Sequence, residues 1–127
     1  MYPRLSRQGL RELLDECIAF TELGEALDTP FETYSQGMKS RLLLSIATAR
    51  PTELLILDEV YDSADQFFRN RVRDRVLRVM RDSGAAILIS HSSDHIRELC
   101  NRAAVLHEGK LVFDGGVTER SEEHTSE

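Results

Sequence analysis

The sequence predicts an α/β fold built around two parallel strands that are joined by a helix. Residues 54–57 and 85–89 are continuous apolar runs of strand length, a pattern typical of strands that are covered on both faces. Between them, residues 64–81 place apolar side chains at helical spacing. This order is that of a βαβ unit, whose right-handed crossover makes the two strands parallel.

The other elements follow from local patterns. We expect a helix over residues 6–20, capped by Ser6, and a second over residues 38–49, preceded by a serine and a glycine. The central helix should bury Phe68, Val72, Val76 and Val79 or Met80, and it ends before Gly84. A short helix over 94–100 and a hairpin around residues 108–110 complete the chain.

Six arginines decorate the central helix. They are Arg69, Arg71, Arg73, Arg75, Arg78 and Arg81. One interpretation is a basic partner-binding surface; the nearby acidic residues and the helical spacing favour the other, a solvated face.

Composition narrows the class of protein. The chain has 127 residues and a net charge of −6, with both signs interspersed, which argues against a nucleic-acid-binding surface. No apolar stretch is long enough for a membrane span or a signal peptide. Cys17 and Cys100 lack metal-ligand spacing and are interpreted as core thiols of a cytosolic chain.

Polar residues that follow the two strands are the candidates for chemistry. Asp58 and Glu59 follow the first strand and His91 follows the second, so the parallel arrangement brings them to one edge of the sheet. For phosphoryl transfer to water, Asp58 would hold Mg²⁺ through water, Glu59 would be the general base and His91 would contact the γ-phosphate. Taken singly, an acidic pair after a strand is often a turn, and a lone histidine is more often structural.

A second group lies before the helix over 38–49. Ser35 and Gly37 offer a hydroxyl and backbone N–H groups at a helix N-terminus, where an anion is favoured. The alternative interpretation is an ordinary serine cap with a turn glycine. A glycine-rich phosphate loop is not found, because the one Gly-Lys pair is Gly109-Lys110 and Ala104 stands where the first glycine is required.

Together these residues resemble the ATP-binding subunit of ABC transporters. Residues 34–38 (Tyr-Ser-Gln-Gly-Met) are similar to the signature motif, 54–58 to the Walker B strand with Glu59 as catalytic base, 62–65 to the D-loop, and His91 to the switch histidine. The resemblance implies part of a P-loop NTPase fold that uses ATP and Mg²⁺. It also implies that Ser35, Gln36, Gly37 and Met38 act in trans on ATP held by a second subunit, with Asp65 in the D-loop.

The form of the signature resembles that of exporters of capsular polysaccharide, O-antigen and teichoic acid. Residues 20–24, 28–30 and 100–107 are similar to the same group, while Gln36, Val60, Tyr61 and Asp62 depart from the usual pattern. The resemblance implies a membrane permease as partner, no nucleic acid, and a peripheral location on the cytoplasmic face of the bacterial inner membrane.

The resemblance also suggests how the chain is divided. Residues 1–50 would be a helical subdomain with the signature and 51–119 the C-terminal part of the P-loop core. Residues 120–127 match a translated sequencing adapter and are expected to be an artefact. We expect the fragment to be inactive alone.

Two other readings remain open. A soluble ABC-type ATPase head of the DNA-repair or chromosome-organising class would carry a coiled-coil insertion before the signature, and no extended heptads are seen. The second alternative is a dimerisation module that does not hydrolyse ATP. The presence of both Glu59 and His91 argues against it.

Overall fold

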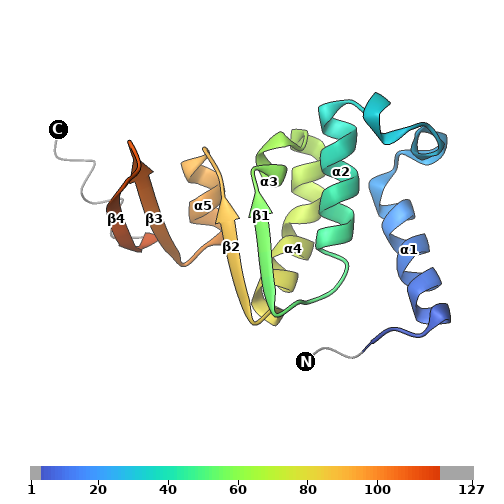
Figure 1. The fold of residues 1–127 in the computed structure, drawn as a ribbon, viewed down its shortest axis with the longest axis horizontal. Coiled ribbons are helices and arrows are strands. Elements are labelled where there is room, and N and C mark those ends of the chain that lie inside the picture. Colours follow the sequence, from blue (N-terminus) through green and yellow to red (C-terminus); the bar gives the residue numbers. More distant parts are fainter. Residues whose placement is uncertain (1–3, 118–127) are drawn as a thin grey trace. The chain divides into compact units, whose positions relative to one another are not determined.

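The computed structural model describes residues 4–117 and confirms a mixed α/β chain (Figure 1). It divides into two compact units with the boundary between Ile89 and Ser90. The first unit contains helices α1 (Arg7–Thr21), α2 (Gln36–Ala47), α3 (Val60–Ser63) and α4 (Gln66–Asp82) with strands β1 (Leu54–Asp58) and β2 (Ala85–Ile89). The second contains α5 (Ser93–Leu99) and strands β3 (Arg102–His107) and β4 (Lys110–Gly116). None of the described helices is both long and apolar enough to cross a membrane.

Serine caps set the start of the first two helices. The Ser6 hydroxyl accepts a hydrogen bond from the Gly9 N–H at 3.0 Å, as predicted for the cap of α1. The Ser35 hydroxyl accepts from the Met38 N–H at 3.2 Å. Because Ser35 is itself the N-cap, α2 begins two residues earlier than predicted and Gly37 lies inside the helix.

The predicted βαβ unit is confirmed, with one difference in its crossover. Strands β1 and β2 pair in parallel, in a register that runs from Leu54 opposite Ala85 to Asp58 opposite Ile89. The crossover holds two helices instead of one, since the chain is extended at Ala64 and α4 starts anew after Asp65. The predicted start of the helix at residue 64 was therefore wrong. Its buried face was right: Phe68, Val72, Val76 and Val79 are all buried.

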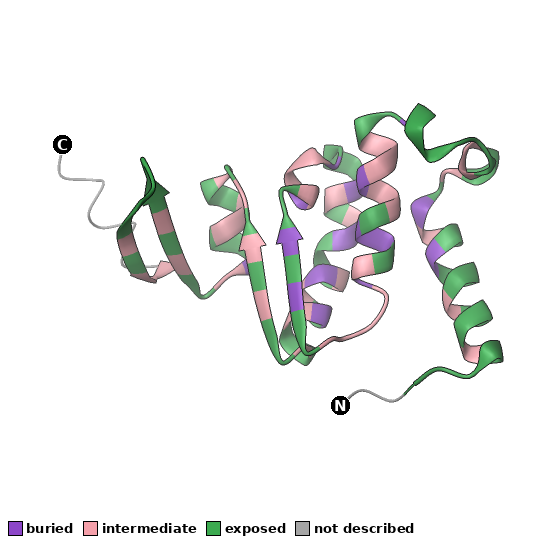
Figure 2. Ribbon diagram, in the orientation of Figure 1, coloured by how far each residue is buried: buried purple, intermediate pink, exposed green. Residues whose placement is uncertain are grey.

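The two faces of the sheet differ, which contradicts the prediction that both are covered. Leu55 and Leu57 are buried, whereas Leu54 and Ile56, on the opposite face of β1, are 52% and 54% exposed. The alternation along β1 is visible in Figure 2. Ile87 and Ile89 of β2 are also exposed. A continuous apolar run shows that both faces of a strand could be buried. Within the described residues, only the face that carries Leu55 and Leu57 is covered.

The second unit confirms the predicted hairpin. Strands β3 and β4 are antiparallel and are joined by Glu108 and Gly109, whose φ angles are 49° and 74°. Two successive positive φ values are typical of the tight turns that match the twist of a hairpin. The predicted adapter-like segment, residues 120–127, lies outside the described residues.

Candidate functional site

Glu59 stands directly after β1 in an unusual backbone conformation. Its φ and ψ are 58° and 2°, in the left-handed region that a residue with a side chain rarely adopts. Its N–H donates to the Ile89 carbonyl at 2.9 Å, and its own carbonyl accepts from the Ser63 N–H and hydroxyl at 3.1 and 2.9 Å. These hydrogen bonds hold the conformation, and such outliers gather at functional sites.

The neighbouring carboxylate, Asp58, belongs to the uncovered face of the sheet. Since side chains alternate along a strand, Asp58 shares that face with Leu54 and Ile56. A segment that covered these apolar residues would also meet the Asp58 carboxylate. Within residues 4–117, no group of three or more His, Cys, Asp or Glu side chains is placed to hold a metal ion. An exposed single carboxylate suits Mg²⁺ that takes its other oxygens from phosphate and water.

His91 follows the end of β2 by two residues and belongs to the second unit. The end of β2 lies opposite Asp58, through the pairing of Asp58 with Ile89. The convergence of His91 with Asp58 and Glu59 stays a prediction.

The segment at the start of α2, residues 34–38, presents a helix N-terminus. Tyr34 anchors it, with its side chain mostly buried and its hydroxyl donating to the Leu27 carbonyl at 2.7 Å. The Ser35 cap leaves the Gln36 and Gly37 N–H groups among the first of the helix, which have no intrahelical acceptor. A Cβ added at Gly37 would meet nothing within 4 Å. The serine-cap reading is confirmed, the turn-glycine reading is wrong, and no packing within the chain requires this glycine.

Asp65 has a structural task. One carboxylate oxygen accepts from the Phe68 N–H at 2.9 Å and caps α4, while the other accepts from Arg41 Nε at 3.1 Å. The Phe68 N–H is the main reason that the pKa of Asp65 lies below its ordinary value, and Arg41 adds to it. Whether Asp65 also contacts nucleotide stays a prediction.

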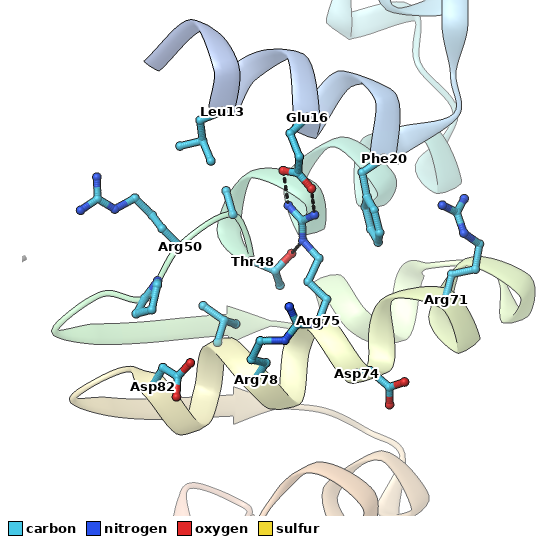
Figure 3. A pocket seen from close by; sticks show the side chains of 13 residues that line it. Leu13, Glu16, Phe20, Thr48, Arg50, Arg71, Asp74, Arg75, Arg78 and Asp82 are labelled. Atoms are coloured by element: carbon cyan, nitrogen blue, oxygen red, sulfur yellow. Dashed lines mark hydrogen bonds and ion pairs between the residues drawn. The ribbon is translucent and has the colours of Figure 1, made fainter. Parts of the chain in front are cut away.

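Arg75 is the residue whose role the sequence did not reveal. Its side chain is only 14% exposed, so the solvated-face interpretation is wrong at this position. It contacts Glu16, 59 residues away, and no pattern along the sequence indicates that pairing. Arg75 lies beside a cavity of about 630 Å³ between α1, α4 and residues 48–51 (Figure 3). None of the predicted site residues lines this cavity.

Comparison with known proteins finds relatives among export ATP-binding proteins. The chain is 35% identical over 98 residues to the teichoic acids export ATP-binding protein TagH of Enterococcus faecalis and 33% identical over 123 residues to that of Levilactobacillus brevis. It is 32% identical over 120 residues to the O-antigen export system ATP-binding protein RfbB of Myxococcus xanthus. These alignments cover 77%, 97% and 94% of this chain but 22%, 34% and 28% of the relatives. No protein-family model matches the chain.

Proposed function

This chain belongs to the family of ABC transporter ATP-binding proteins that serve polysaccharide export, and we propose that it forms part of the ATP-hydrolysing machinery of such an exporter. The chain spans 22%, 34% and 28% of the length of these three relatives. The activity therefore belongs to the whole protein, by which we mean the protein that contains this chain together with a phosphate loop.

One observation carries the proposal. Asp58 ends the parallel strand β1 and Glu59 follows it directly, and Asp58 shares an exposed apolar face with Leu54 and Ile56. Ligands of open α/β sheets bind at the carboxyl ends of strands, which is where these two carboxylates lie. A phosphate loop that covered this face would bring nucleotide phosphates to them.

The roles follow from the chemistry of phosphoryl transfer. Mg²⁺, when bound, offsets the charge of the phosphates, and Asp58 would hold it through water. Glu59 would accept a proton from the attacking water, and the hydrogen bonds to Ile89 and Ser63 keep its backbone from turning away. His91 would donate a hydrogen bond to the γ-phosphate.

The signature segment, residues 34–38, would act on a different nucleotide. Ser35, Gln36, Gly37 and Met38 lie at the start of α2, where unpaired N–H groups and the helix dipole favour phosphate oxygens. In our proposal they contact ATP held by a second subunit, and the absence of a side chain at Gly37 lets that phosphate approach the backbone. The working form is a dimer bound to a membrane permease, on the cytoplasmic face of the bacterial inner membrane.

The test is ATP hydrolysis by the whole protein and by the 127-residue chain. We expect Glu59→Gln to abolish turnover in the whole protein while nucleotide binding persists, because the amide cannot take the proton. Glu53→Gln, directly before β1, is the matched control and should hydrolyse like wild type. Persistent turnover in the Glu59→Gln variant contradicts the assignment of the base.

The chain alone should release no phosphate beyond its own Glu59→Gln variant. Turnover above that background would show that the chain does not need a phosphate loop, and the proposal would have to be abandoned.

A further inference from the structure

Arg75 of α4 contacts two other helices of the first unit. Its Nε donates to Thr48 Oγ1 at 2.9 Å and one terminal nitrogen donates to the Ser45 carbonyl at 3.0 Å, so it satisfies acceptors at the C-terminal end of α2. Both terminal nitrogens also donate to the carboxylate of Glu16 on α1. The guanidinium lies over the Phe20 ring, 4.3 Å from its centroid (Figure 3).

Arg41 makes a second connection, close to the other end of α2. Its Nε donates to Asp65, the cap of α4, and a terminal nitrogen donates to the Thr21 carbonyl at the end of α1, 3.2 Å away. Its guanidinium carbon is 5.0 Å from the centroid of the Phe68 ring. With a side chain only 20% exposed, Arg41 is shielded from competing water.

Helix α2 is thus attached to α4 at both ends. The attachment through Arg41 follows the signature segment by three residues, and the attachment through Arg75 lies at the C-terminal end of the helix. Asp65 follows Glu59 by six residues, with only the short helix α3 between them. Two separated attachments restrain both the rotation and the translation of α2, whereas one would leave it free to pivot.

We propose that Arg41 and Arg75 are positioning residues that fix the signature segment relative to Glu59. This inference rests on the proposed function. A guanidinium holds a planar fork of donors that can serve acceptors on two helices at once, a geometry that lysine cannot reproduce. In the dimer, the signature segment and Glu59 of one subunit would serve different nucleotides, so the two arginines would set the alignment that both sites need.

The experiment compares turnover, nucleotide affinity and thermal stability in the whole protein. We expect Arg75→Ala and Arg41→Ala each to lower kcat about tenfold, the scale of one lost hydrogen bond to a charged group. When the whole protein is measured as a single subunit outside the dimer, its Kd for nucleotide should stay within about twofold of wild type, because the phosphate loop is unchanged. Arg78→Ala is the matched control: Arg78 is exposed, lies on the same helix, and makes no hydrogen bond or ion pair with any described residue.

A charge swap separates positioning from stability. Glu16→Arg combined with Arg75→Glu restores the ion pair between α1 and α4 but leaves the Ser45 carbonyl without its guanidinium donor. Compared with Arg75→Ala, we expect the double variant to have a higher melting temperature but an equally low kcat. Joint recovery of both, or wild-type kcat in Arg75→Ala, would overturn the inference.

A milder variant covers the case in which Arg75→Ala does not fold. Thr48→Val removes one acceptor at nearly constant shape, and we expect kcat to fall there too; wild-type kcat in that variant would count against the inference. If the wild-type whole protein itself hydrolyses no ATP, the proposed function fails and the inference fails with it. Wild-type turnover with unaffected arginine variants defeats the inference alone.

Discussion

At the scale of single residues, Glu59 combines the proposed chemistry with a backbone conformation that is unfavourable for any side chain. A left-handed φ of 58° costs about 1–2 kcal/mol for residues other than glycine. The hydrogen bonds to Ile89 and Ser63 are the visible compensation. The proposed role of Glu59 as the general base would explain why a glutamate stands where glycine would be more favourable.

This cost is measurable with two variants that both remove the carboxylate. We expect the chain with Glu59→Gly to have a free energy of unfolding about 1 kcal/mol greater than the chain with Glu59→Ala, because glycine adopts positive φ without a steric penalty. Urea denaturation measures the difference. At Glu12, inside α1, the same pair should show the opposite order, since alanine favours helix by about 1 kcal/mol. Equal stabilities at position 59 would contradict the assignment of strain.

Asp65 makes the stability of the fold depend on pH. Its pKa is lower in the folded chain than the ordinary value of 3.8, so ionised Asp65 stabilises the fold above that pH. The stabilisation is lost as the pH falls through the lower folded pKa. Asp65→Asn keeps a capping side chain and removes the charge.

We expect the stability difference between wild type and Asp65→Asn to be constant near neutral pH and to disappear in strong acid. Chemical denaturation at a series of pH values measures it, and other carboxylates cancel in the difference. A gap that does not change with pH would contradict the role of the charge.

At the scale of elements, Gly84 shows why the helix α4 passes so tightly into β2. Gly84 lies just beyond the end of α4, as predicted, and its φ is not positive, so no left-handed conformation requires a glycine there. A Cβ built on Gly84 would lie 2.6 Å from the Glu53 carbonyl oxygen, part of the chain that enters β1. The Gly84 N–H donates to the Thr52 carbonyl at 3.0 Å. Close approach of two backbones therefore demands glycine here.

We expect Gly84→Ala to lower the free energy of unfolding by about 1–3 kcal/mol, because a backbone atom has to move. Gly37→Ala is the matched control. It has open space around its Cβ and lies in a helix, so it should raise stability, by up to about 1 kcal/mol. Thermal or urea denaturation of both chains measures these changes. If Gly84→Ala left the free energy of unfolding unchanged, the backbone at Glu53 would be able to move aside at little cost, contrary to this expectation.

At the scale of the whole molecule, one face of the sheet in the first unit leaves four apolar side chains exposed to solvent. Leu54, Ile56, Ile87 and Ile89 are between 43% and 54% exposed. Parallel sheets are normally covered on both faces, and contiguous apolar surface of this kind drives association.

We therefore expect the chain to self-associate and the double substitution Ile56→Thr and Ile87→Thr to reduce it, at a cost within about 1 kcal/mol for exposed sites. Analytical ultracentrifugation measures the association. Leu57→Thr, on the buried face of the same strand, should instead destabilise the fold by about 2 kcal/mol or more. Unchanged association in the double variant would show that another surface is responsible.

The sequence by itself determined the features that depend on neighbouring residues. Apolar runs specified both parallel strands, the 3.6-residue period specified the buried face of α4, and Ser6 and Ser35 specified helix starts. The placement of Asp58 and Glu59 at a strand end followed from the same patterns. Each of these arises from hydrogen bonds or side-chain spacing within a few residues.

Tertiary structure alone decided the rest. It paired Arg75 with Glu16, gave Glu59 its left-handed backbone, required glycine at position 84, and left one face of the sheet uncovered. These features depend on whether segments distant in sequence come into contact. The periodicity of the sequence does not reveal such contacts. The candidate carboxylates were therefore predictable from the sequence, whereas the contacts of Arg41 and Arg75 that attach α2 to α4 were not.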